Sequence, residues 1–130
     1  MIIKPTSKAN ILFSLAIFWS GLILYLSLAN IDDIKIVELN ASDKLYHTAC
    51  YFILGVLWFL FFHVKQGQLA TSKKLIVAGC LILFGIIIEI LQFVLTSYRT
   101  FDLWDALANA VGIFLASLFI NAMLKRLIKK

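Results

Sequence analysis

The sequence predicts an all-α fold, an integral membrane bundle of four transmembrane helices. Of its 130 residues, 62% are hydrophobic and the mean hydropathy is +0.97, whereas an ordinary soluble domain is roughly 45–50% apolar. The apolar residues also come in four blocks, and the length of each is close to that of a helix that crosses a bilayer core, about 20 residues. A soluble chain this short could not bury so much apolar surface.

The first two blocks are residues 11–29 and residues 45–64. The first carries no charged side chain, and it is longer than the apolar core of about 7–15 residues in a signal sequence, so we favour a retained helix over a cleaved signal. The second is rich in Phe, Leu and Trp and contains His47 near its start. Both predict spanning helices, because a segment in lipid must satisfy its own backbone hydrogen bonds.

The third and fourth blocks are residues 75–96 and residues 103–124. The third is interrupted only by Glu89 and Gln92, and the fourth contains Asp105, Asn109 and Asn121. The connections between blocks are too short to hold another domain, so residues 1–130 are predicted to form one four-helix transmembrane domain. Cys50 and Cys80 fall in different helices and do not indicate a disulfide framework.

The basic residues predict the orientation. Four spans place nine basic residues on the side of the termini (Lys4, Lys8, Lys65, Lys73, Lys74, Lys125, Arg126, Lys129 and Lys130) and three on the other (Lys35, Lys44 and Arg99). Cytoplasmic loops carry the excess of Lys and Arg, so we expect a protein of the cell inner membrane with both termini in the cytoplasm. The net charge of +5 then reflects topology and contact with membrane lipids, and no nucleic acid partner is predicted.

One charged residue within the third block needs a reason, because ionisable groups in lipid are costly and mark functional sites by default. Gly85, Glu89, Gln92 and Thr96 fall at i, i+4, i+7 and i+11, so the four residues share one face of the helix. At 1.5 Å per residue Glu89 would lie about 10 Å below the outer end of its helix. This face should contact other helices.

Polar residues at helical spacing reach the same outer level on two other helices. The fourth helix carries Asp102, Asp105, Asn109 and Gly112 on one face, and the second carries Asp43, His47 and either Cys50 or Tyr51. We therefore expect Glu89, His47, Arg99 and Asp105 to form one cluster. The structural alternatives are an N-cap at Thr100 or Asp102, interhelical hydrogen bonds from Asn109 and Gln92, close packing at Gly85 and Gly112, and an ion pair of Glu89 with Arg99 or Lys44.

Three motifs carry a family resemblance. They are Asp43-Lys44-Leu45-Tyr46-His47 followed by Tyr51-Phe52 and Gly55, then Gly85 with Glu89 and Gln92, then Arg99 with Phe101-Asp102-Leu103-Trp104-Asp105, Asn109 and Gly112. In order and spacing they resemble the VanZ-like family over about residues 40–120. The resemblance implies a small multi-pass membrane protein of the bacterial cell envelope with a link to resistance to teicoplanin, a glycopeptide antibiotic, and it brings no established reaction. The ligand-binding residues it implies are Asp43, Lys44, His47, Glu89, Gln92, Arg99, Asp102, Asp105 and Asn109.

The function we favour is binding or modulation of a lipid-linked or cell-wall ligand through an outward-facing polar pocket. Lys44, Arg99 and protonated His47 could pair with ligand phosphate or carboxylate. A membrane-embedded enzyme is the first alternative, with Glu89, His47 and Asp105 as catalytic candidates for acid–base chemistry, although the sequence has no recognised catalytic motif.

Three further alternatives stay open. A membrane scaffold would use the polar residues only to hold the helices together. A metal site of His47, Glu89 and an aspartate lacks a recognised ligand spacing, so no metal and no cofactor is predicted. A nucleophilic pair of His47 and Cys50 has no supporting motif.

Overall fold

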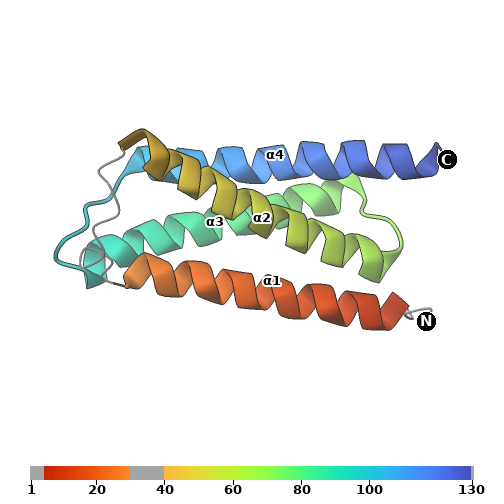
Figure 1. The fold of residues 1–130 in the computed structure, drawn as a ribbon, viewed down its shortest axis with the longest axis horizontal. Helices are drawn as coiled ribbons and strands as arrows, with labels where there is room; N and C mark the ends of the chain where they lie inside the picture. Colours follow the sequence, from red (N-terminus) through yellow and green to blue (C-terminus); the bar gives the residue numbers. More distant parts are fainter. Residues whose placement is uncertain (1–4, 30–39, 130) are drawn as a thin grey trace.

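The computed structural model describes residues 5–29 and 40–129, and these form four α-helices (Figure 1). They are α1 (Pro5–Leu28), α2 (Asn40–Gln66), α3 (Thr71–Leu95) and α4 (Leu103–Ile128). All four are long and apolar enough to cross a membrane, and no strand occurs in the described ranges. The predicted fold class is confirmed, and the chain is a multi-pass membrane protein.

The helices extend beyond the predicted apolar blocks. They begin at Pro5, Asn40 and Thr71 rather than at residues 11, 45 and 75, and α4 ends at Ile128 rather than at residue 124. Hydropathy detects only the part of a helix that lies in hydrocarbon, whereas the backbone hydrogen bonding continues through the polar turns at the membrane surface. With 24 to 27 residues each, the helices are about 36–40 Å long, enough to span a core of about 30 Å with some tilt.

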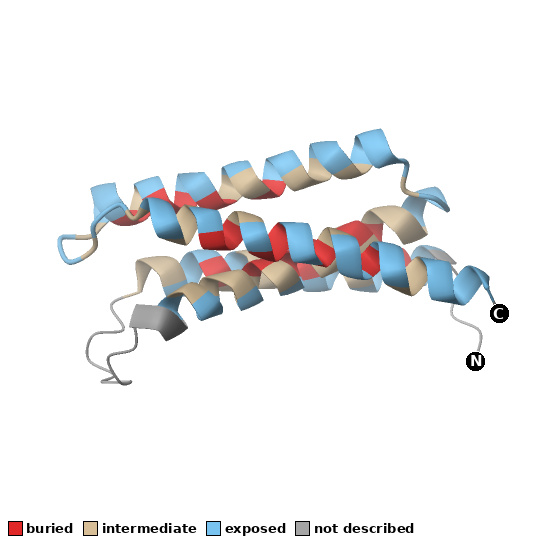
Figure 2. Ribbon diagram, turned by 90° about the horizontal axis from the view of Figure 1, so that it is seen from above, coloured by how far each residue is buried: buried red, intermediate tan, exposed pale blue. Residues whose placement is uncertain are grey.

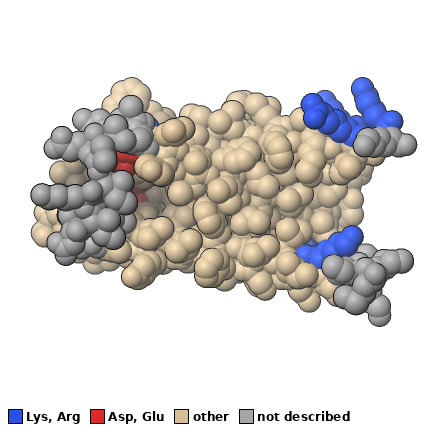
Figure 3. All heavy atoms as spheres, viewed as in Figure 1, with Lys and Arg blue, Asp and Glu red and all other residues tan. Residues whose placement is uncertain are grey.

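The helices alternate in direction (Figure 1), and α2, like α3, contacts all three of the other helices. Its most extensive interface is with α4. The helix α1 begins at the end of the bundle where α4 finishes, and α2 and α4 both begin at the opposite end. We call the end where α2 and α4 begin the acidic end and the other the basic end. Lys and Arg gather at the basic end, and Asp and Glu are seen only at the acidic end (Figure 3).

Two glycines allow α2 and α4 to pack closely. A Cβ atom added to Gly112 would fall on the backbone carbonyl oxygen of Thr48, and one added to Gly55 would lie 2.7 Å from the Cβ of Ala116. The close approach is supported by a hydrogen bond in which the Thr48 hydroxyl donates to the Ala108 carbonyl over 3.2 Å. Small residues at such interfaces let helix backbones approach within lipid, so the predicted packing role of Gly112 is confirmed.

The outer surface of the bundle is apolar between its two charged ends. Figure 2 shows buried residues on the inward helix faces and exposed ones on the outward faces, and Figure 3 shows a wide uncharged belt across the middle of the face it draws. Large apolar side chains such as Phe18, Ile76 and Phe114 are exposed on this belt. Exposure on this scale is expected for a surface that lipid tails cover.

A polar cluster at the acidic end

Lys44, in the second turn of α2, connects α2 to the start of α4. Its ammonium donates to Asp102 Oδ2 over 2.6 Å and also to Asp105 Oδ1. Asp102 is the N-cap of α4, because its other carboxylate oxygen accepts the backbone N–H of Trp104 at 2.8 Å. The Lys44 ammonium and, next, the Trp104 N–H stabilise the ionised carboxylate, so the pKa of Asp102 lies below its usual value.

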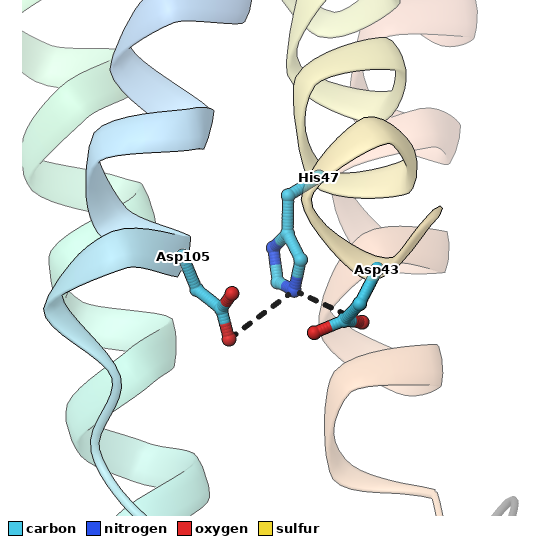
Figure 4. A group of neighbouring side chains, drawn as sticks. All are labelled: Asp43, His47 and Asp105. Carbon is cyan, nitrogen blue, oxygen red and sulfur yellow. Dashed lines mark ion pairs between the residues drawn. The ribbon is translucent and has the colours of Figure 1, made fainter. Parts of the chain in front are cut away.

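His47 lies one turn further along α2 and faces three polar residues. Its Nδ1 is 3.0 Å from Asn109 Oδ1. Because an amide oxygen can only accept, Nδ1–H is the donor and neutral His47 carries its free lone pair on Nε2. That Nε2 atom lies 3.6 Å from Asp105 Oδ2 and 3.8 Å from Asp43 Oδ1, between the two carboxylates (Figure 4).

Glu89 comes from α3 and completes this group from the bundle interior. Its side chain is 2% exposed, its Oε1 is 3.9 Å from His47 Nδ1, and that oxygen has no hydrogen-bond partner among the described residues. The ion pair of Glu89 with Arg99 or Lys44, considered from the sequence, does not form. Lys44 instead forms ion pairs with Asp102 and Asp105, which lie closer to the start of α4. Arg99 makes no ion pair within residues 5–29 and 40–129.

We call the group of Asp43, Lys44, His47, Glu89, Asp102, Asp105 and Asn109 the polar cluster. The structure thus brings together seven of the nine residues predicted for the site. Glu89 and Asn109 lie about 9 Å from the nearest helix end, since each is six residues from it at 1.5 Å per residue. The cluster contains four carboxylates and one lysine, which leaves it net negative.

Gln92 is the predicted site residue that serves packing instead. It is 3% exposed, and its side-chain amide donates to the backbone carbonyl of Ser27 over 2.9 Å. The Tyr98 hydroxyl donates to the neighbouring Leu28 carbonyl over 3.2 Å. Both carbonyls belong to the last turn of α1, where the helix itself supplies no donor. Gln92 therefore fixes the end of α1 to α3, as its interhelical alternative proposed.

Tyr51 is a buried polar residue that the predicted site left out. It is 2% exposed, and its hydroxyl has no partner within the described part of the chain; the same holds for Asn109 Nδ2. Both side chains flank Gly85, where an added Cβ would lie 3.0 Å from the Tyr51 ring and 3.3 Å from Asn109 Nδ2. The helical spacing from His47 indicated that either Cys50 or Tyr51 lies on the same face, but the sequence alone could not decide between these two residues.

Chemically, the polar cluster combines a fixed imidazole with several carboxylates and unused hydrogen-bonding atoms. Glu89 Oε1 can accept, Asn109 Nδ2 can donate, and the Tyr51 hydroxyl can do either. Most buried polar groups in proteins have a partner, so three unpartnered atoms in the same region leave capacity for a further polar group, either water or a ligand.

Among known proteins, the chain is similar to a fission yeast protein, "Uncharacterized protein C11E3.10" of Schizosaccharomyces pombe. The two are 35% identical over 89 residues, which cover 68% of this chain and 52% of the yeast protein. The chain therefore spans about half the length of the curated relative it matches. No family model matches the chain, and no solved structure matches it.

Proposed function

We propose that the chain is a VanZ-like protein of the bacterial inner membrane that binds or modulates a lipid-linked or cell-surface ligand through the polar cluster. The VanZ-like motifs support this proposal, because each contributes to the same group: Lys44 and His47 from the first, Glu89 from the second and Asp105 from the third. The motifs of the resemblance and the contacts in the structure select the same residues.

The observation that carries the proposal is the buried, unpartnered carboxylate oxygen of Glu89. An acid in lipid costs about 2.5–3.5 kcal/mol at the bilayer centre on insertion scales. If this position served packing alone, an apolar side chain would serve it at least as well, because replacing buried ionic groups with apolar ones is often neutral or stabilising. Retaining a buried acid whose Oε1 has no hydrogen-bond partner among the described residues favours a role in binding.

The charge distribution supports placing the polar cluster on the outer side of the membrane. Seven basic residues of the described ranges lie at the basic end (Lys8, Lys65, Lys73, Lys74, Lys125, Arg126 and Lys129), against Lys44 and Arg99 at the other. The positive-inside rule then puts the basic end in the cytoplasm. Polar side chains about 9 Å below the outer end are at a depth where they would meet the head group of a lipid or the lipid-linked part of an envelope molecule.

The contacts also narrow the ligand chemistry expected from the sequence. Lys44 is engaged by Asp102 and Asp105, so it is not free to pair with a ligand phosphate. The acceptors left in the net negative polar cluster suit the hydroxyl or amine groups of a ligand.

The test is to identify what the purified protein carries. Native mass spectrometry of the wild type in detergent should show a bound lipid-like molecule, and Glu89→Gln, which keeps the shape and removes the charge, should lose it while the melting temperature stays nearly the same. Lys74→Gln is the control, because it removes one charge at the opposite end, where Lys74 contacts Asn121. Retention of the molecule by Glu89→Gln, or equal loss in Lys74→Gln, would contradict the proposal.

The resemblance also gives a cellular test. Cells that carry the wild-type chain should be less susceptible to teicoplanin than cells without it, and cells with Glu89→Gln should match the latter at equal protein abundance. Equal protection by the two chains would separate the polar cluster from any antibiotic phenotype.

A further inference from the structure

Three potential metal-ligand atoms converge between α2 and α4 at the acidic end. Asp43 Oδ1, His47 Nε2 and Asp105 Oδ2 are drawn together in Figure 4, and one ligand atom from each of these residues lies within 4.8 Å of the others. The separations from Nε2, 3.8 Å to Asp43 and 3.6 Å to Asp105, are longer than a hydrogen bond. The three atoms thus face a common space without bonding to one another.

Neighbouring contacts hold two of these atoms free for a ligand. His47 Nδ1–H donates to Asn109 Oδ1, so the lone pair on Nε2 points toward the two aspartates. Asp105 Oδ1 accepts from Lys44, which leaves Oδ2 on the side of His47. A histidine whose second ring nitrogen donates to an oxygen is the usual arrangement for a metal-binding imidazole, because that contact fixes the tautomer and the ring orientation.

The electrostatics of the polar cluster point to a cation. Within the described part of the chain, Asp43, Glu89, Asp102 and Asp105 face a single lysine. The Glu89 carboxylate is 2% exposed, its Oε1 has no hydrogen-bond partner there, and this oxygen lies 3.9 Å from Nδ1 of the same imidazole. A cation on Nε2 would polarise the Nδ1–H bond toward its oxygen acceptors and offset the excess of negative charge. Buried charges are otherwise found paired or on a metal.

We propose that Asp43, His47 and Asp105 bind one divalent transition-metal ion, with the remaining coordination positions open. One imidazole and two carboxylates are a mixed N/O set that suits Zn²⁺ or Mn²⁺. Metal–ligand bonds of about 2.0–2.2 Å let two ligand atoms share an ion when they are up to about 4.3 Å apart, which includes both separations from Nε2. The Asp43 side chain is 57% exposed, so it has room to move its carboxylate closer to the ion.

The inference rests on the proposed function in locating the ligand at the polar cluster, and it adds how that ligand would be held. A net negative group of side chains repels a phosphate, whereas a dication with open positions binds phosphate and carboxylate oxygens directly. A ligand that carries both kinds of group would then place its phosphate or carboxylate on the metal rather than on Lys44, and its hydroxyl or amine groups on the remaining acceptors of the polar cluster.

The test is a titration of the full chain, purified in detergent without a polyhistidine tag and treated with a chelator, with Zn²⁺ or Mn²⁺ alone. Calorimetry should show one equivalent bound, and His47→Gln and Asp43→Asn should each weaken binding at least about tenfold, the smallest loss expected even for an outer partner of a metal site. His63→Gln is the matched control, because His63 lies near the other end of α2. Its affinity should equal that of the wild type.

Absence of binding to the wild type at millimolar metal, or equal losses in His47→Gln and His63→Gln, would overturn the metal site. Asp43→Asn keeps the test decisive if His47→Gln misfolds, because Asp43 is largely exposed; unchanged affinity in a folded Asp43→Asn protein would also overturn it. Native mass spectrometry separates the two proposals. Lipid retained by the wild type without metal affinity rejects only the metal, and metal binding without any bound lipid rejects only the proposed function.

Discussion

The two ends of the bundle are built from the same four helices but differ in what they bury. At the acidic end, four polar side chains of the described ranges are buried, those of Tyr51, Glu89, Gln92 and Asn109. At the basic end the pair of Lys74 and Asn121 is on the surface, and the buried side chains are apolar, such as Phe59 and Ile120. His63, which is only partly buried, places its Nδ1 atom in the interior there without a partner among the described residues. Within the described ranges no polar side chain is buried as a whole at the basic end, so the buried polar side chains at the other end are not a general requirement of this fold.

Orientation is the all-or-none test of this comparison. In a chain whose own cysteines are replaced, a cysteine at position 68 should be labelled only from the cytoplasm, and one at position 35 only from outside, because of the basic asymmetry. Gln68 is exposed between α2 and α3, whereas Lys35 lies outside the described residues. Membrane-impermeant maleimide on intact cells and on inverted vesicles makes the measurement, and a reversed pattern would put the polar cluster in the cytoplasm.

The largest energetic effect should come from Gly112→Leu. The new side chain would meet the backbone at Thr48 and Phe52 and force α2 from α4, so we expect a loss of at least about 1–3 kcal/mol, the usual cost of overpacking. The same separation would pull His47 away from Asn109. Thermal unfolding in detergent gives the measurement, and Gly79→Leu is the control because nothing lies within 4 Å of the position of its Cβ. Equal melting of the two variants would mean that α2 and α4 are not tightly packed.

The sequence anticipated the four spans and the level of the polar cluster, since both follow from periodicity. Depth along a helix is fixed by 1.5 Å per residue, so Glu89 and Asn109 could be placed at one height before any contact was known. Which side chains pair at that height depends on the rotation of α2 against α4. That rotation is set by the contacts at Gly55 and Gly112, and periodicity alone does not specify it.

Competition between partners explains the details that the sequence left open or missed. Lys44 could reach either Glu89 or the start of α4, and two aspartates there outcompete one buried acid. Gln92 shares a helix face with Glu89, yet the unpaired carbonyls at the end of α1 engage it. The convergence of Asp43, His47 and Asp105 joins two helices and has no short sequence spacing to reveal it. Each of these pairings depends on how the helices pack against one another, which the sequence alone does not specify.

A smaller effect should separate the two asparagines of α4. Asn109→Leu removes the acceptor of His47 Nδ1 in the interior, and leaving a buried donor unsatisfied costs about 1–3 kcal/mol. Asn121→Leu removes a surface contact with Lys74 at the basic end and should change stability by no more than about 0.5 kcal/mol. Denaturation of both variants in one detergent compares the ends directly. A larger loss for Asn121→Leu would reverse the contrast drawn between them.

The smallest effect should be a pH dependence at the surface of the acidic end. The Lys44 ammonium and the Trp104 N–H lower the pKa of Asp102 in the folded chain, whereas the pKa of an aspartate in the unfolded chain is about 3.9. A lowered folded-state pKa contributes stability that is complete above the unfolded value and is lost as the pH falls through the folded value. Asp102→Asn isolates this contribution, because asparagine is also a good N-cap and can still accept the Trp104 N–H. The wild type should therefore melt slightly above Asp102→Asn at neutral pH. The difference should begin to shrink below about pH 4 and should vanish once the pH is below the lowered pKa of the folded chain. A difference that persisted in acid would instead assign the effect to the cap, and the ion pair with Lys44 would then contribute nothing to holding α2 against α4.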